Sequence, residues 1–200
     1  MFYISLRHEP NLTKHCPQPL SYIDNYYTTK APHHPNEWHD DRVQIFTLGP
    51  DTLFVEKSNF VLILNGYISN LREITGSNQV LSELEVLAER YATQGLNGFK
   101  ECRGSFSIAL YNKISHDVCI VSDFYGFRPT FYSQTDNFSL FCSRHQPISE
   151  HREFNKELSD QTIFDYLLVG LNFRNETFFK FLKMTSAKSV LHSHKGDIQE

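Results

Sequence analysis

The chain has 200 residues, of which 40% are hydrophobic, 14% aromatic and 21% charged, and its formal net charge is −4. This composition excludes a disordered or fibrous protein and is typical of a globular chain with one ordinary domain or two small ones. The negative charge and the absence of a basic run argue against a nucleic-acid partner.

The N-terminal segment lacks the apolar core of a signal peptide, and no apolar stretch approaches the length of a membrane-spanning helix. We therefore expect a cytoplasmic protein that does not enter a membrane.

Four cysteines are present without CxxC spacing: Cys16, Cys102, Cys119 and Cys142. Most of them lie inside apolar runs, which favours free buried thiols in a reducing compartment over a disulfide framework.

The N-terminal half is expected to be mostly β-structure. In residues 2–6, Phe2, Ile4 and Leu6 share one face, which is the period-two pattern of a strand that begins at the second residue. Residues 7–41 contain scattered prolines and polar residues and are expected to form a long irregular loop. Three strands should follow, over 43–48, 52–57 and 60–64, the last ending at a sharp Asn65-Gly66 turn.

A helix is expected over residues 81–95, because Leu84 and Leu87 share one face and Ser82 with Glu85 would form a capping box. Later segments are predicted as an antiparallel meander of four strands, then a helix, then a last strand. They are residues 105–111, 117–122, 130–134 and 138–143, then 160–169, then 189–194. This order of elements favours an α+β layered sandwich.

Five short patterns stand in the same order as in a known family. They are N-G-Y-I-S-N at 65–70, S-E-L-E-V at 82–86, C-R-G-S-F-S-I-A-L-Y at 102–111, D-F-Y-G-F-R-P at 123–129 and D-Y-L-L-V-G at 165–170. Together they resemble the class II glutamine amidotransferase domain that forms the N-terminal half of asparagine synthetases. The resemblance implies the N-terminal-nucleophile fold, an αββα sandwich of two antiparallel sheets flanked by helices, in a single domain over residues 1–200.

The chain departs from this family where the family's chemistry begins. In the family, the residue after the initiator methionine is a cysteine, whose thiolate attacks the glutamine amide while its own α-amine serves as the base. Position 2 here is Phe2, and a phenyl ring has no nucleophilic atom. So bulky a second residue is also expected to leave Met1 in place. We therefore expect no catalytic residue and no glutaminase activity.

The resemblance also assigns residues of this chain to other positions of the family's glutamine site, and these residues match the family only in part. The Asn65 side-chain amide and the Gly66 backbone N–H match an oxyanion hole, although a tight turn after a buried strand is the simpler explanation. Glu83 stands where the family has an aspartate that holds the substrate's α-ammonium group. Arg42 is a candidate for the arginine that binds the substrate carboxylate, with a solvated surface arginine as the simpler alternative.

In two places the sequence groups histidine or aspartate residues, whose side chains can bind metal ions. They are His33, His34 and His39 beside Asp40 and Asp41, and the pair His192 and His194. Neither set has a recognised ligand spacing, so we expect surface histidines and no metal site.

Three functions remain open. The first is a glutaminase-degenerate domain with a scaffold or substrate-docking role in an asparagine-synthetase-type, ATP-dependent, amide-forming ligase. The S-G-G-x-D-S loop of such ligases does not occur here, so no cofactor is expected in this chain. ATP and magnesium would bind only in a C-terminal ATP-pyrophosphatase synthetase domain or subunit. The second function is a stand-alone module that binds an amino acid or a peptide, and the third is an active amidohydrolase that uses Cys16.

Overall fold

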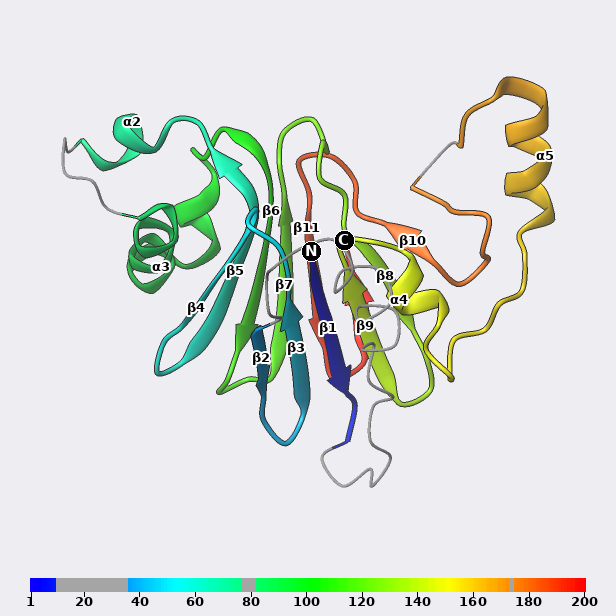
Figure 1. The fold of residues 1–200 in the computed structure, drawn as a ribbon, viewed down its shortest axis with the longest axis horizontal. Coiled ribbons are helices and arrows are strands. Elements are labelled where there is room, and N and C mark those ends of the chain that lie inside the picture. Colours follow the sequence, from blue (N-terminus) through cyan, green and yellow to red (C-terminus); the bar gives the residue numbers. More distant parts are fainter. Residues whose placement is uncertain (10–35, 77–81, 173–174) are drawn as a thin grey trace.

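Two six-stranded antiparallel sheets lie face to face in the computed structural model, which describes residues 1–9, 36–76, 82–172 and 175–200 (Figure 1). The first sheet, ordered β10-β8-β9-β1-β3-β2, consists of β1 (Phe2–Arg7), β2 (Asn36–His39), β3 (Val43–Thr47), β8 (Phe131–Gln134), β9 (Phe138–Cys142) and β10 (Lys183–Met184). The second, ordered β12-β11-β7-β6-β5-β4, consists of β4 (Thr52–Glu56), β5 (Phe60–Ile68), β6 (Gly104–Asn112), β7 (Asp117–Ser122), β11 (Val190–His194) and β12 (Asp197–Gln199). The expected pair of antiparallel sheets is confirmed.

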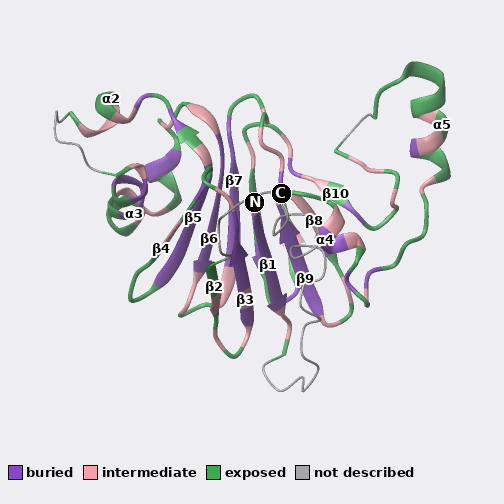
Figure 2. Ribbon diagram, in the orientation of Figure 1, coloured by how far each residue is buried: buried purple, intermediate pink, exposed green. Residues whose placement is uncertain are grey.

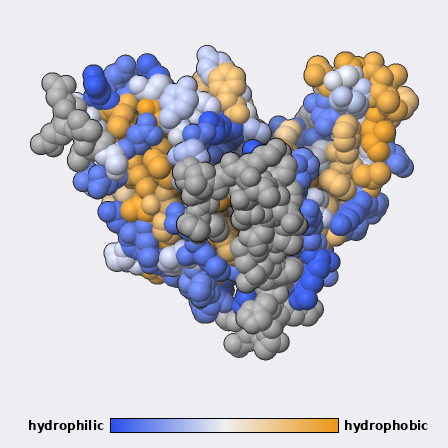
Figure 3. Space-filling model, viewed as in Figure 1, coloured by the Kyte–Doolittle hydropathy of each residue, from blue (hydrophilic) through white to orange (hydrophobic). Residues whose placement is uncertain are grey.

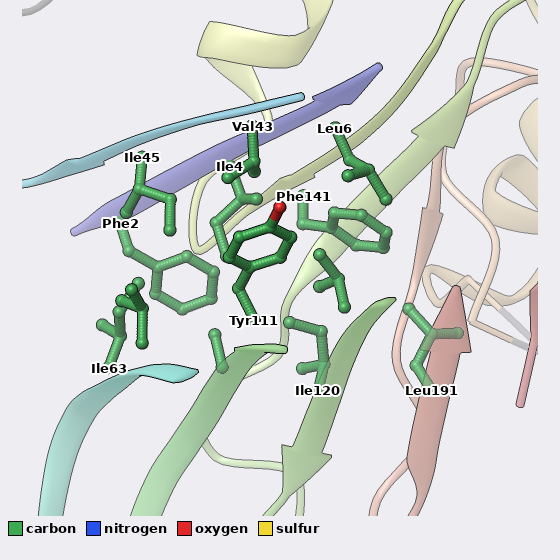
Figure 4. Close-up of a cluster of buried hydrophobic side chains, with 13 residues drawn as sticks. Phe2, Ile4, Leu6, Val43, Ile45, Ile63, Tyr111, Ile120, Phe141 and Leu191 are labelled. Carbon is green, nitrogen blue, oxygen red and sulfur yellow. The ribbon is translucent and has the colours of Figure 1, made fainter. Parts of the chain in front are cut away.

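The central core of the sandwich lies between the two sheets and begins at the first strand. The side chains of Phe2, Ile4 and Leu6 on β1 point toward the second sheet, where Ile63 and Tyr111 meet them (Figure 4). All five are at most 2% exposed. The alternation predicted for residues 2–6 is therefore confirmed, and each large apolar side chain buried here contributes about 1.5–3 kcal/mol to the stability of the sandwich.

Strand β5 is longer than the sequence indicated. It runs through Asn65 and Gly66 to Ile68, so the sharp turn expected at Asn65 and Gly66 is wrong. Gly66 pairs with Phe106 of β6 at a φ of +116°, and a Cβ there would lie 2.1 Å from the carbonyl oxygen of Ser105. A glycine is required here because two strands approach closely, and not because the chain turns.

Helices cover part of the outer face of each sheet. The described helices are α2 (Leu71–Thr75), α3 (Glu83–Gln94), the 3₁₀ helix η1 (Gly95–Phe99), α4 (Gln146–Ser149) and α5 (Asp160–Val169), of which α5 does not cover a sheet. Helix α3 lies over β4 and β5, and α4 lies beside β8 and β9. The capping box predicted between Ser82 and Glu85 is present at the start of α3. These elements supply the helical layers that the resemblance implied.

Two parts of the chain differ from the sequence predictions. Residues 36–39, expected in the irregular loop, form β2 and pair with β3, because the Asp40 carboxylate accepts two backbone N–H groups and closes the turn between them. Residues 10–35 lie outside the described part of the chain. The strands in 105–143 do not form one meander, because residues 123–130 carry the chain from β7 in the second sheet to β8 in the first.

Helix α5 stands away from both sheets (Figures 1 and 2). It has the predicted bounds and ends at Gly170, whose φ is +76°. Thr162 is the buried residue of α5, so its apolar side chains face outward. None of the described helices is long and apolar enough to cross a membrane.

Candidate functional site

Residue 2 lies at the start of β1, between β3 and β9. The side chain of Phe2 is 0% exposed and lies near Ile63 in the core between the sheets (Figure 4). A nucleophile at this place would have to reach a substrate, whereas the phenyl ring only fills volume in the core. Residue 2 therefore contributes packing and no reactive atom.

The α-amine of Met1 lies beside the start of β1 and is held by two neighbours. It donates to the carbonyl oxygen of Leu48 and to Oγ1 of Thr52, the latter at 2.6 Å. The Thr52 hydroxyl in turn donates to Oδ1 of Asn65 at 3.3 Å. Burial lowers the pKa of the amine to about 6, and nearby arginine charge acts in the same direction. Much of the amine is therefore neutral at pH 7 and carries a lone pair.

A cavity of about 320 Å³ opens beside this amine, and we call it the Met1 cavity. Its wall includes Asn65, Asp51 and the two arginines Arg128 and Arg144. Nη2 of Arg128 lies 3.5 Å from Oδ2 of Asp51, in a partly exposed ion pair. Two guanidinium groups against the single Asp51 carboxylate give this wall an excess of positive charge, which suits a ligand with a carboxylate.

Asn65 and Gly66 have different places in this site. Asn65 lines the Met1 cavity and is 6% exposed. The Gly66 N–H donates to the carbonyl oxygen of Asp51 at 2.8 Å, next to the β4–β5 pairing. A donor that is already paired in a sheet is not available to an oxyanion. Two groups were expected to form the oxyanion hole, the Asn65 side chain and the Gly66 N–H. The Asn65 side chain lines the cavity, and its amide group takes no part in the backbone pairing that occupies the Gly66 N–H.

Glu83 and Arg42, the two residues expected to bind glutamine, have different surroundings. Glu83 begins α3, its Oε1 accepts the Ile68 N–H at 3.4 Å, and burial raises the pKa of its carboxyl group. Arg42 precedes β3, and its carbonyl oxygen accepts the Arg7 N–H. It lies at the end of β1 opposite to Met1, separated by the length of β3, about 15 Å. Neither residue is among the described residues that line the cavity.

Asp123 organises the loop at the edge of this cavity, a role that sequence reasoning missed. It is 1% exposed, and its carboxylate accepts the N–H groups of Tyr125, Phe127 and Arg128 in the loop and of Phe106 in β6. A buried carboxylate with four backbone donors fixes the loop and brings Arg128 to the cavity. The signal was present in D-F-Y-G-F-R-P, because an aspartate before a glycine-containing turn is typical of side-chain capping of the backbone.

The described cysteines are buried thiols. Cys119 on β7 and Cys142 on β9 are 7% and 0% exposed, as expected for residues on strands. Cys102 is half-buried and lies between η1 and β6, outside the strands. Burial raises the pKa of Cys102 and Cys119 to about 11 and that of Cys142 to about 12. All three are neutral at pH 7 and poor nucleophiles, whereas Cys16 lies outside the described residues.

The paired histidines near the C-terminus share a carboxylate. His192 and His194 lie on one face of β11, and Nδ1 of His194 is 2.6 Å from Oδ1 of Asp117. Nε2 of His192 is 3.6 Å from Oδ2 of the same residue. His33 and His34 lie outside the described part of the chain.

Asp40 and Asp41 meet a histidine that the sequence did not associate with them. Potential ligand atoms of Asp40, Asp41 and His116 all lie within 4.8 Å of one another. The Asp40 carboxylate is already engaged, since it accepts two backbone N–H groups and the hydroxyl of Tyr111. This cluster joins the β2–β3 turn to the β6–β7 turn and is far along the strands from Met1.

Comparisons with known proteins agree with this architecture. Residues 41–200 match the family described as glutamine amidotransferase domain. Asparagine synthetase [glutamine-hydrolyzing] 2 of Bacillus subtilis (strain 168) is 29% identical over 123 residues, which cover 56% of this chain and 16% of that relative. A solved structure described as the allosteric regulatory enzyme of purine biosynthesis is 12% identical, with a TM-score of 0.52.

That superposition covers 99% of this chain and 42% of the other, so this chain matches less than half the length of either relative. At 12% identity the likeness to the solved structure shows a shared fold. The family match extends over most of the chain, from the turn between β2 and β3 to the end, and Met1 and β1 lie outside the matched residues. The chain therefore belongs to the glutamine amidotransferase domain family.

Proposed function

We propose that this domain does not hydrolyse glutamine and that it serves as a docking domain for an ATP-dependent, amide-forming synthetase of the asparagine synthetase kind. The observation that carries the proposal is the burial of Phe2, which is 0% exposed where the family's resemblance places a nucleophilic cysteine. ATP and magnesium would then belong to the partner synthetase domain or subunit.

The surroundings of residue 2 support the loss of hydrolysis. The Gly66 N–H is paired with Asp51, so one donor of an oxyanion hole is unavailable. The neutral α-amine of Met1 would remain a base. The Cys142 thiol lies near enough to affect the pKa of this amine, but it is 0% exposed, its own pKa is raised to about 12, and it is not among the described residues that line the cavity. A base without a nucleophile and with half an oxyanion hole does not support acyl transfer.

A mechanism-based label tests the missing nucleophile. A diazoketone analogue of glutamine alkylates the nucleophile of an active glutaminase, and the added mass is read by intact-protein mass spectrometry. We expect no added mass on this chain. A label that maps to Met1 or to Cys16 would contradict the proposal, and a label on Cys16 that disappears in Cys16→Ser would favour an active amidohydrolase.

The docking role is supported by α5. Phe164, Leu167 and Leu168 follow i, i+3, i+4 spacing on α5 and are 57%, 77% and 67% exposed, and Leu171, just past the end of the helix, is 63% exposed. A soluble helix with this spacing normally buries the stripe, whereas here the stripe points to solvent (Figure 3). We call it the α5 stripe. An exposed apolar stripe of this size is typical of a surface that another domain covers.

A second exposed apolar group lies on the loop that Asp123 fixes. Phe124, Tyr125 and Phe127 are 60%, 69% and 67% exposed. This loop and α5 both project beyond the ends of the strands on the side where β1 begins (Figure 1). A partner domain that contacts both would therefore also cover the entrance to the Met1 cavity.

A binding function of the Met1 cavity is the second candidate, favoured by its cationic wall. Its volume of about 320 Å³ lies in the range of small-ligand sites, and Arg128 with Arg144 would hold a carboxylate. Titration calorimetry with an amino-acid panel and with short peptides tests this candidate. Binding that weakens in Arg144→Gln would support it, whereas no heat across the panel would remove it.

A further inference from the structure

A second cavity, separate from the Met1 cavity, lies on the outer face of the second sheet and has a volume of about 600 Å³. We call it the β7–β11 cavity. Half of its described lining residues are apolar: Leu96, Phe99, Phe106, Val121, Phe124 and Val190. Such a volume and lining are typical of sites for small molecules with an apolar body.

The cavity exists because the helical layer is incomplete. Helix α3 packs over β4 and β5, and η1 continues that layer only as far as the cavity's edge. Val121 of β7 and Val190 of β11 are paired neighbours beyond this edge, and Val190 is 42% exposed. Val190 therefore adds an exposed apolar surface beside the buried Val121, in a floor that the described helices leave partly uncovered.

The rim of the cavity carries positive charge. Lys100 follows η1 and Lys188 precedes β11, and both are exposed lining residues. Nζ of Lys188 lies 5.1 Å from the ring centroid of Phe124, so the ammonium group is held at the rim. No carboxylate occurs among the described residues that line the cavity, and the Glu200 carboxylate beside it accepts a hydrogen bond from the lining residue Ser189. An apolar floor with a cationic rim is complementary to a molecule that has an apolar body and an anionic head.

We propose that the β7–β11 cavity binds a medium-chain fatty acid, with the acyl chain on Val121 and Val190 and the carboxylate between Lys100 and Lys188. Each additional methylene group removed from water strengthens binding by about fourfold, which sets the dependence on chain length. The lysines are exposed, so each adds about two- to fivefold to affinity.

Calorimetric titrations with octanoate, decanoate and dodecanoate, kept below their micelle concentrations, test the acyl site. We expect one saturable site whose dissociation constant falls by about 16-fold for each two carbons until the cavity is filled. Decanol should bind more weakly than decanoate, and decyltrimethylammonium more weakly still. Absence of saturable binding, or equal binding of the cationic probe, would overturn the proposal.

Variants locate the binding. Lys100→Gln and Lys188→Gln should each weaken decanoate binding by about two- to fivefold and leave decanol unchanged, whereas Lys57→Gln, at the β4–β5 turn, should change neither. Val190→Phe fills the floor at a partly exposed position and should abolish binding without unfolding the chain. Unchanged binding in Val190→Phe would overturn the assignment to this cavity.

Discussion

The backbone N–H of Gly66 donates to the carbonyl oxygen of Asp51, with 2.8 Å between the two atoms. This bond extends the pairing of β4 with β5, and it places a group that resembles an oxyanion donor inside the sheet ladder. The same glycine faces Ser105 of β6 so closely that no side chain fits. Gly66 is therefore explained by the packing of β4, β5 and β6.

Replacement of Gly66 by alanine should destabilise the domain strongly. The new Cβ would lie 2.1 Å from a backbone oxygen, and the φ of +116° is strained for any L side chain. We expect Gly66→Ala to lower the free energy of unfolding by more than about 3 kcal/mol. The matched control is Gly76→Ala, where nothing lies within 4 Å and the left-handed φ alone should cost about 1 kcal/mol. Urea denaturation measures both, and equal losses would contradict the packing explanation.

Phe2 should behave as a core residue. Phe2→Ala removes a ring that is fully buried, and a loss of about 3–5 kcal/mol in the free energy of unfolding is expected. Phe164→Ala is the matched control, because Phe164 is 57% exposed on α5 and its loss should change stability by less than about 0.5 kcal/mol. If Phe2→Ala were as mild as the control, residue 2 would not be part of the core.

The α-amine of Met1 should make folding depend on pH. Its pKa is lowered to about 6 from its ordinary value of 8.0, chiefly by burial, so between these values the unfolded chain binds a proton that the folded chain does not. The free energy of unfolding of a chain that begins at Met1 is therefore expected to rise between about pH 6 and pH 8, by on the order of 2 kcal/mol. A chain acetylated at Met1 should lack this rise. Identical pH profiles of the two chains would show that the amine is not buried.

The α5 stripe should be needed for association and not for folding. Leu167→Glu and Leu168→Glu change side chains that are 77% and 67% exposed, so each should alter the free energy of unfolding by less than about 0.5 kcal/mol. Binding to a synthetase domain of the asparagine synthetase kind should weaken by at least about tenfold, because a charge would be buried in the interface. Gln161→Glu on the same helix is the control for added charge. Unchanged binding in both leucine variants would remove α5 from the docking surface.

Local patterns predicted much of the fold. The alternation at residues 2–6, the capping box at Ser82 and the glycine stop at Gly170 all depend on neighbours within a few residues, and the structure confirms them. The two-sheet arrangement followed from the family resemblance, because pairing between strands far apart in sequence is not encoded in any one segment.

The site could be predicted only in part, because its geometry depends on register. Arg42 matched a motif, but the antiparallel pairing of β1 with β3 carries it to the end of β1 opposite to Met1. Arg128 and Arg144 reach the Met1 cavity through the crossing between sheets and the end of β9, which no local pattern indicates. The sequence predicted the bounds of α5. It did not predict that the α5 stripe faces solvent, because the spacing of apolar residues does not show whether another element packs against that face of the helix.

Turnover of amide-¹⁵N-labelled glutamine tests most directly the proposed absence of glutamine hydrolysis in this domain. Ammonium-¹⁵N released by the purified chain is followed by NMR beside a buffer control over the same time. We predict release equal to the spontaneous rate in buffer. Release above that rate that scales with protein concentration and saturates with glutamine would contradict the account.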